Sequence, residues 1–249
     1  MEITQEQINK HIKRLESKND YSHLEPILNE IFNSKELRKL NNFDNEIKSL
    51  FLQLKKDNLY LLEDRYPNLI GDIERSKFLQ NTEYLKLANI FSYIDIEKKM
   101  SVLVPEKFSK KDFILTRINL YLSICETIIF LFEDVLRRSE FQGSLSVGSL
   151  SHFLENFYPQ YRSLFNSINK NIRNSIGHNN YEIFENSEEI TFNYFDDRTK
   201  KFKFRKLSFQ EFTKIAWESI YLFEVIFKNV EHCFLDEIKA EYRRNGFTI

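Results

Sequence analysis

The sequence predicts an all-α fold with one small β-hairpin inserted before the last helix. Glycine (5) and proline (4) are scarce among the 249 residues, whereas an all-β fold needs such turn residues often. Apolar residues make up 42% of the chain, enough for a hydrophobic core, and in two long segments they recur every three or four positions, as on one face of a helix. Alternation with period two is confined to one region near residues 190–205.

The range 1–105 is predicted to be an N-terminal helical region, and it contains no recognisable chemical motif. Thr4 and Gln7 form a capping-box pattern that opens the first helix. Apolar stripes predict further helices over 24–32, 43–54 and 78–96. The segment 102–110 is predicted to link this region to a second helical domain at 106–249, because Pro105 interrupts the pattern and Ser109 can cap the next helix.

The strongest helix pattern lies between Ile114 and Val135, where apolar residues repeat as in a heptad seam. We expect this helix to be buried, either as core alone or as core and dimer interface together. The serine-containing stretch 139–151 is predicted to be a loop. Helical pattern then resumes, is interrupted near Pro159 and continues to His178, where Gly177 and the pair Asn179-Asn180 predict a helix end.

The predicted hairpin consists of residues 190–195 and 201–205, joined by a polar turn. Residues 181–184 form a shorter extended candidate. Ser208 and Glu211 then form a second capping box. Apolar stepping from Phe212 to Cys233 predicts the closing helix of the chain.

Composition and spacing argue against several classes of protein. The two cysteines lie in apolar helical runs, which indicates buried thiols rather than a disulfide framework. The most apolar stretch, 118–132, contains Glu126 and is shorter than the roughly 20 residues that cross a bilayer. The chain opens on polar residues and has neither a glycine-rich phosphate loop nor histidines at metal-ligand spacing. We therefore expect a cytoplasmic protein without a membrane partner, a cofactor or a metal.

The segment Asn171-Ile-Arg-Asn-Ser-Ile-Gly-His178 carries residue types suited to cutting RNA. Cleavage without a metal uses the ribose 2′-OH as nucleophile, and it needs a base, an acid and a cation near phosphorus. A histidine such as His178 suits proton transfer, and an arginine such as Arg173 stays charged and can bind two phosphate oxygens. One chain supplies one such histidine, so we expect a symmetric homodimer that brings two copies of the motif into one composite site.

This segment resembles the R-x4-H motif of HEPN ribonucleases, with Arg173, a polar residue at Asn174, and His178. The flanking pattern is also similar over roughly 110–245, with a long apolar helix before the motif and a capped helix after it. Members of that family are typically homodimeric, metal-independent endoribonucleases of toxin–antitoxin, phage-defence and CRISPR systems. The resemblance implies a HEPN-like helical bundle in which Arg173 and His178 carry catalysis and Asn174 supports their placement.

The motif departs from one branch of that family. Toxins paired with a small nucleotidyltransferase carry R-x4-H-x-Y, and the tyrosine of that motif is modified. Here Asn180 occupies the tyrosine position, and the nearest tyrosine is Tyr181. Regulation by that modification is therefore not carried over to this chain.

The net charge of −1 gives no overall basic surface, so RNA contacts must come from local patches. Lys170 and three residues of a basic segment, Lys201, Lys203 and Arg205, are candidate RNA contacts. The alternative for the basic segment is an edge strand that its lysines protect against aggregation. The sequence as a whole predicts an endoribonuclease that acts on RNA as a toxin or an abortive-infection effector, with an antitoxin or another defence-system subunit as a further partner. The alternative is a non-catalytic HEPN-like protein that binds RNA or serves as an antitoxin or scaffold.

Overall fold

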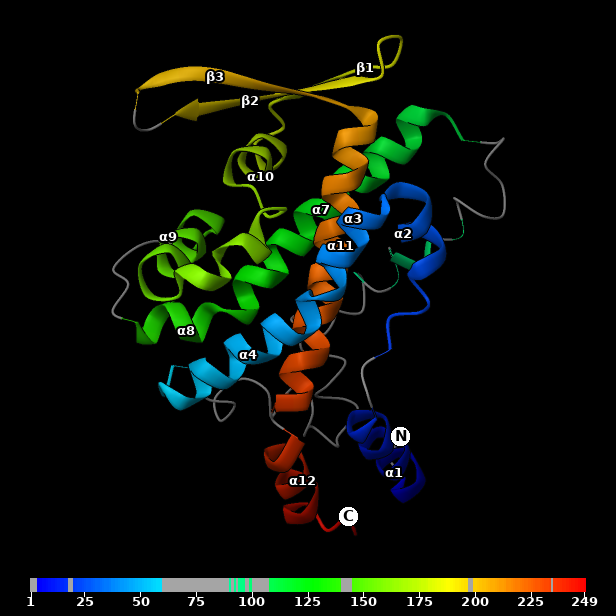
Figure 1. Cartoon of the computed structure of the whole chain (residues 1–249), viewed down its shortest axis with the longest axis vertical. Coiled ribbons are helices and arrows are strands. Elements are labelled where there is room, and N and C mark those ends of the chain that lie inside the picture. The colour runs from blue at the N-terminus through cyan, green and yellow to red at the C-terminus, as the bar shows by residue number, and fades with distance from the viewer. Residues whose placement is uncertain are drawn as a thin grey trace.

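The computed structural model describes residues 4–17, 20–59, 108–139, 145–196, 199–233 and 235–249, together with 90, 92, 94–96 and 99. These residues are mostly helical, and a small antiparallel sheet lies across one end of the helices (Figure 1). The predicted helix over 78–96 and the predicted linker at 102–110 lie largely outside the described residues. The division of the chain near residue 105 therefore stays a prediction.

Within the described residues 4–59 the chain forms four helices: α1 (Gln5–Glu16), α2 (Glu25–Ile31), α3 (Ser34–Asn41) and α4 (Phe43–Lys56). The capping box that opens α1 is present, because the Thr4 amide donates to Gln7 Oε1 at 2.9 Å and the Gln7 amide donates to Thr4 Oγ1 at 3.3 Å. The sequence patterns did not predict α3. This short helix begins at a capping box formed by Asn33 and Glu36 and buries little apolar surface of its own, so it has no clear apolar stripe.

The helices after residue 108 are α7 (Lys110–Leu131), α8 (Glu133–Arg138), α9 (Val147–Phe157), the 3₁₀ helix η4 (Pro159–Phe165), α10 (Lys170–Gly177), α11 (Phe209–Cys233) and α12 (Leu235–Arg244). The prediction of a single helix over 114–135 is wrong at its end, because the helix is interrupted at Phe132, between α7 and α8. The Phe132 ring packs 5.5 Å from both Phe51 and Phe165, so contacts distant in sequence override the local pattern.

Three further helix predictions need correction. The predicted loop over 139–151 is partly helical, since Ser146 caps α9 by accepting a hydrogen bond from the Ser149 amide at 3.2 Å. The predicted interruption near Pro159 is present, since α9 ends at Phe157, but the helix predicted from there to His178 is divided into η4 and α10. The last described helix is α12, so the sheet precedes the last long helix, α11, rather than the last helix of the chain.

The predicted hairpin is present and belongs to a three-stranded sheet. Strands β1 (Tyr181–Phe184), β2 (Glu189–Asp196) and β3 (Lys201–Ser208) run antiparallel in the order β1-β2-β3. The side chains of Ile190, Phe192 and Leu207 are buried on the inner face of the sheet, which packs on the helices. The opposite face carries exposed phenylalanines, so only one face of the sheet contributes to the core.

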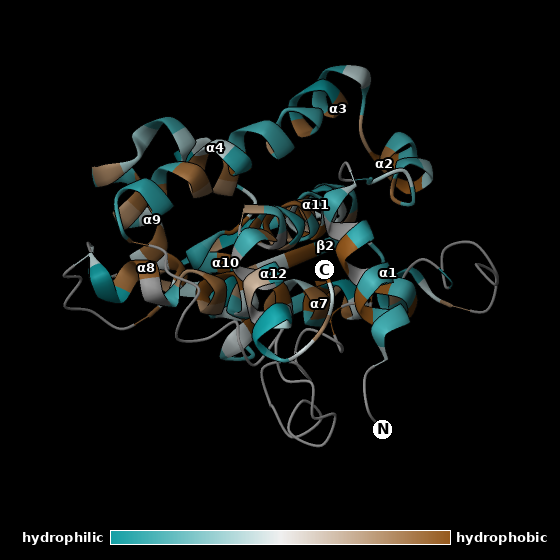
Figure 2. Ribbon diagram, turned by 90° about the horizontal axis from the view of Figure 1, so that it is seen from below, coloured by the Kyte–Doolittle hydropathy of each residue, from teal (hydrophilic) through white to brown (hydrophobic). Residues whose placement is uncertain are grey.

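The core is organised around α11, which lies between α4 and α7 (Figure 2). Trp217 and Phe223 of α11 are fully buried, and the apolar stripe of α4 is buried too. The described helices from both sides of residue 105 therefore share one hydrophobic core.

Helix α7 has the length and the apolar composition of a membrane span, with 22 residues and a mean hydropathy of 1.6 over its most apolar window. Much of that window is buried in the protein, where α7 packs against α11, α10 and α9. A core helix passes the same test of length and composition. Its packing thus accounts for its apolar side chains without a membrane.

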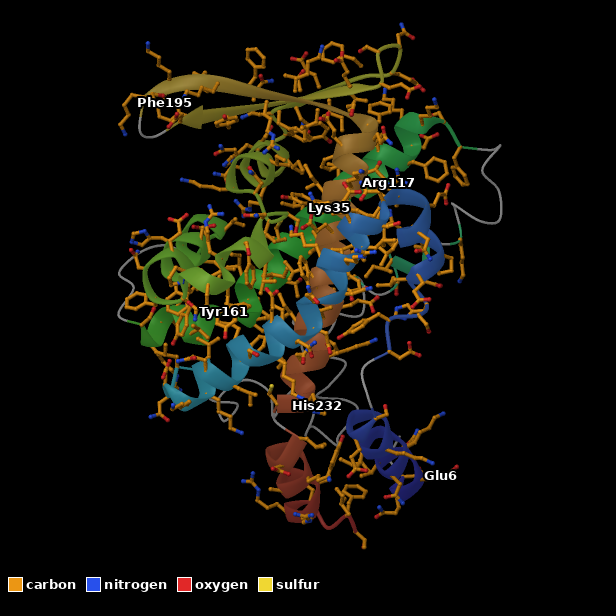
Figure 3. All side chains as sticks on the ribbon, viewed as in Figure 1. Glu6, Lys35, Arg117, Tyr161, Phe195 and His232 are labelled. Carbon is orange, nitrogen blue, oxygen red and sulfur yellow. The ribbon has the colours of Figure 1, made fainter. Side chains whose placement is uncertain are left out.

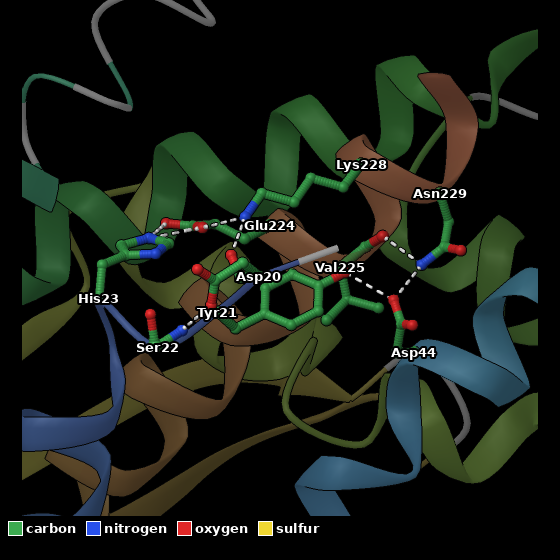
Figure 4. Close-up of polar contacts among 9 residues, drawn as sticks. All are labelled: Asp20, Tyr21, Ser22, His23, Asp44, Glu224, Val225, Lys228 and Asn229. Atoms are coloured by element: carbon green, nitrogen blue, oxygen red, sulfur yellow. Dashed lines mark hydrogen bonds and ion pairs between the residues drawn. The ribbon is translucent and has the colours of Figure 1, made fainter. Parts of the chain in front are cut away.

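A polar cluster ties the segment before α2 to α11 (Figure 4). The Glu224 side chain is 4% exposed, and its carboxylate lies 2.9 Å from His23 Nε2 and 3.8 Å from Lys228 Nζ. Lys228 also donates to the main-chain carbonyl of Asp20 at 2.6 Å. Because Glu224 is buried, its contacts with His23 and Lys228 compensate the hydration that its carboxylate loses.

Replacing Glu224 with alanine should lower the free energy of unfolding by about 1–3 kcal/mol, because it removes the hydrogen bond between the buried carboxylate and His23, and hydrogen bonds to charged groups contribute about that much. The matched control is Glu218→Ala on the same helix, where the carboxylate is 20% exposed and lies 3.2 Å from Lys39 Nζ. That more exposed pair should cost less than about 1 kcal/mol. Urea unfolding of both variants measures the difference, and equal losses would contradict a structural role for the buried cluster.

Candidate functional site

The predicted motif lies on α10, a short helix between α7 and β2. Asn169 caps its start, since Asn169 Oδ1 accepts hydrogen bonds from the amides of Asn171 and Ile172 at 3.0 and 3.2 Å. The buried side of the helix consists of Ile172, Ser175 and Ile176. The remaining positions form the polar face of α10, made up of Lys170, Asn171, Arg173, Asn174, Gly177 and His178.

The helix ends where the sequence predicts, with His178 as the C-cap residue. Asn179 has a φ of 54°, the left-handed conformation that asparagine tolerates better than most residues. Two main-chain hydrogen bonds close the turn after the helix: the Asn179 amide donates to Ile176 O at 2.9 Å and the Asn180 amide donates to Ser175 O at 2.7 Å. This C-terminal motif fixes the direction in which the His178 backbone leaves the helix.

The guanidinium of Arg173 is held by two side chains. Its Nε donates to Glu126 Oε1 of α7 at 2.7 Å, and its Nη2 also contacts that oxygen. Its Nη1 donates to Asn174 Oδ1 at 3.1 Å. The main-chain carbonyl of Asn174 accepts a hydrogen bond from the His178 amide at 3.0 Å. Asn174 therefore contacts both Arg173 and His178, through its side chain and its main chain respectively.

Arg173 and His178 occupy different edges of the polar face. At about 100° per residue the two side chains are offset by about 140° around the helix axis. The Arg173 side chain is 29% exposed and leans toward α7. His178 is exposed, and within the described part of the chain its imidazole makes no hydrogen bond or ion pair. A single copy therefore leaves His178 accessible to a ligand or to a second copy of the chain.

The four candidate RNA contacts come from two elements, α10 and β3. Lys170 lies at the end of α10 opposite His178, and Lys201, Lys203 and Arg205 lie on β3, an edge strand. Lys203 forms an ion pair with Asp196, which raises the pKa of the Lys203 ammonium. Exposed lysines on an edge strand suit both interpretations of the segment, phosphate contact and protection of the edge.

A cavity of about 450 Å³ lies at the N-terminal end of α10, whereas His178 lies at the C-terminal end. Its walls come from α9, η4, the start of α10 and the end of β2. No local pattern could reveal it, because these elements are separated in the sequence. Among its lining residues are Arg162, Lys170, Asn171, Tyr194 and Asp196.

Sequence reasoning noted Glu126 only as a charge within an apolar helix, and it missed the contact with Arg173. No sequence signal could have revealed this partner, because the Glu126 side chain is 48% exposed and only a buried carboxylate needs a cation beside it. The neighbouring Cys125 is no candidate nucleophile, because burial raises the pKa of its thiol to about 12. Among the described residues, no group of three or more histidine, cysteine, aspartate or glutamate side chains has metal-site geometry.

If the chain has the RNA-cleaving activity that the sequence predicts, Glu126→Gln should lower its rate by roughly tenfold, because a misplaced catalytic group can cost up to about 10²-fold. Removing the negative charge would also favour phosphate binding, but by only about 1 kcal/mol at solvent-exposed distances near 4 Å. The lost placement of Arg173 should therefore outweigh the gain in phosphate binding, so the cleavage rate should fall. The matched control is Glu16→Gln, whose carboxylate is 49% exposed against 48% for Glu126 and pairs with Lys239 far from α10.

The measurement is the initial cleavage rate of a labelled RNA, together with the urea unfolding curve of each variant. Both substitutions should change the free energy of unfolding by less than about 1 kcal/mol, because both ion pairs are partly exposed. Equal cleavage rates for Glu126→Gln and Glu16→Gln would show that Glu126 does not position Arg173 for cleavage.

Comparison of the chain with protein-family models, with curated proteins and with solved structures found no match.

Proposed function

We propose that the chain is a metal-independent endoribonuclease of the HEPN type, with Arg173 and His178 at its catalytic centre. One observation carries the proposal. A single polar helix face presents a guanidinium held by Glu126 and Asn174, together with an exposed imidazole at the helix end. Those are the two group types that cleavage through the ribose 2′-OH requires.

The proposed reaction forms one bond and breaks another at the same phosphorus. The 2′-oxygen attacks, and the bond between phosphorus and the 5′-oxygen of the next nucleotide breaks. One imidazole takes the 2′-OH proton and a second imidazole gives a proton to the leaving 5′-oxygen. The Arg173 guanidinium stabilises the added negative charge on the phosphoryl oxygens. The products are a 2′,3′-cyclic phosphate and a 5′-hydroxyl.

Two imidazoles require two copies of His178. A homodimer with twofold symmetry brings two identical polar faces together, so that each copy contributes one arginine and one histidine to a shared cleft. The exposure of the His178 side chain in the single chain supports this arrangement.

By the resemblance of its motif, the protein would act as a toxin or as a phage-defence effector in abortive infection. An antitoxin or another subunit of the defence system would then restrain it. The non-catalytic alternative, an RNA-binding, antitoxin or scaffold protein, is supported by the contact between Arg173 and Glu126. An arginine committed to a carboxylate is less available to a phosphate.

The two functions are separated by incubating purified protein with mixed RNA in EDTA. The proposed function predicts cleavage by the wild-type chain and its loss in His178→Ala. RNA binding without cleavage by the wild type would favour the non-catalytic alternative. Equal cleavage by both proteins would remove His178 from the reaction.

A further inference from the structure

The cavity at the start of α10 has the size and the lining of a ligand site. Its volume of about 450 Å³ lies within the range of about 300–1,000 Å³ that is usual for small-molecule pockets. Figure 1 shows α9, α10 and the end of β2 around this region, and Figure 3 places Phe195 at that end of the sheet. The cavity is therefore built from four separate elements.

The charged side chains in the lining of the cavity are two cations, Arg162 and Lys170, and one carboxylate, Asp196, among the residues that the structure describes. Arg162 Nε donates to Glu155 at 2.8 Å, and Lys203 pairs with Asp196, so each of these carboxylates is matched by a cation. Lys170 adds a further positive charge to the lining. The N-terminal amides of α10 contribute less, because Asn169 caps two of them. The cationic side chains thus favour an anionic ligand.

The cavity also contains groups that suit a nucleobase. Tyr194 lines it with a half-buried aromatic ring, on the same side of β2 as the buried Phe192. Asn171 contributes a side-chain amide, which can donate and accept hydrogen bonds at a base edge. An aromatic ring beside cations is the combination that single-stranded nucleic acids use, with stacking of the base and contact to the phosphate.

The polar face of α10 connects the cavity to the catalytic motif. Lys170, Asn174 and His178 follow one another at intervals of four residues, which places them along one side of the helix. At about 1.5 Å per residue, the eight positions from Lys170 to His178 span about 12 Å. A ligand that reaches both ends must be an elongated anion, and a short stretch of RNA has that form.

We propose that the cavity binds one nucleotide of a single-stranded RNA whose chain continues along α10 to His178. Lys170 contacts its phosphate, Tyr194 stacks on its base, and Asn171 contacts the base edge. The occupant is single-stranded, because a walled cavity accepts an unstacked base, whereas duplex RNA presents its backbone and a shallow groove. This inference rests on the proposed function, since it assumes that RNA is the ligand of the motif.

The test measures binding without cleavage. His178→Ala protein of full length is titrated into a fluorescein-labelled ten-nucleotide RNA of mixed sequence, and anisotropy is recorded at several salt concentrations. Adding Tyr194→Leu should weaken binding by at least about fivefold, because stacking on that ring is lost. Adding Lys170→Gln should reduce the slope of log K against log salt by about 0.7, as expected for one lost phosphate contact on a single strand.

Two further variants guard against indirect effects. Asn171→Ala, at a half-exposed position, should weaken binding without lowering the unfolding temperature, so a folding defect in Tyr194→Leu would not decide the question. Lys110→Gln is the charge control, because Lys110 is 69% exposed and pairs with Glu188 away from the cavity. It should leave both the affinity and the salt slope unchanged.

Unchanged affinity and salt slope in all three cavity variants would overturn the proposal, even if the wild-type chain cuts RNA. Equal binding of a matching duplex through the same residues would also overturn it. If binding depends on the cavity but the wild type never cuts RNA in EDTA, the cavity proposal stands and the proposed nuclease function fails.

Discussion

Replacing His178 with alanine is expected to lower the rate of RNA cleavage by about 10²- to 10⁴-fold, the usual contribution of a group that transfers protons in the transition state. The arginine stays in place in this variant, because Glu126 and Asn174 hold it independently of the imidazole. RNA binding should therefore change much less than the rate. The loss should fall on kcat rather than on KM.

The fold should tolerate this substitution. His178 is exposed, and its contribution to the helix end comes from main-chain hydrogen bonds that alanine also makes. The free energy of unfolding is thus expected to change by no more than about 0.5 kcal/mol. The matched control is His152→Ala, because His152 is also an exposed histidine but lies within α9. A nuclease that retains full activity without His178, or loses it equally without His152, would not use the proposed site.

The second large effect concerns the number of copies in the site. When wild-type protein and His178→Ala are allowed to exchange subunits at equal amounts, only about a quarter of random dimers contain two intact histidines. Cleavage should fall toward that fraction if both imidazoles are required. A monomeric site predicts about half of the wild-type rate in the same mixture, because each intact chain would act alone.

The measurement is the initial rate across a series of mixing ratios at constant total protein, with exchange achieved by co-refolding or co-expression. The composite site predicts a rate that follows the square of the wild-type fraction. Mixing with the control His152→Ala should leave the rate at the wild-type value throughout. A linear fall with His178→Ala would show that one copy is sufficient, and it would contradict the composite site.

The end of α10 could be predicted because every signal for it is local. Gly177 and the following asparagines provide the turn, and the two main-chain hydrogen bonds that close it join residues no more than five positions apart. The break at Phe132 could not be predicted in this way. It depends on the rings of Phe51 and Phe165, which belong to other helices. The apolar pattern is the same whether that helix continues or breaks.

The same distinction applies to the candidate site. The positions of Arg173, Asn174 and His178 on one helix follow from their spacing, and the structure has all three on the exposed side. The partner of Arg173 does not follow from spacing, because Glu126 lies 47 positions earlier in the chain. The cavity is also invisible to sequence patterns, since its walls meet only in the folded protein.

The sheet shows an intermediate case. Alternation predicted β2 and β3 and their pairing, although only β2 alternates in burial. In β3 the alternating residues Lys201–Lys206 are exposed on both faces, and only Leu207 is buried. The short segment from Tyr181 to Phe184 was only an extended candidate. It becomes a strand because β2 offers it a free edge, and hydrogen bonds across that edge pair Tyr181 with Phe192. Pairing partners of so short a strand are decided by the fold.

The most direct test of the central claim is the chemistry of the cut. A defined RNA oligonucleotide is incubated with the wild-type chain in EDTA, and its fragments are analysed by mass spectrometry. The account predicts 2′,3′-cyclic phosphate and 5′-hydroxyl ends, and no cut when the nucleotide on the 5′ side of the cleaved bond carries a 2′-deoxyribose. Cleavage of the 2′-deoxy substrate at the same bond, or ends bearing a 5′-phosphate, would contradict it.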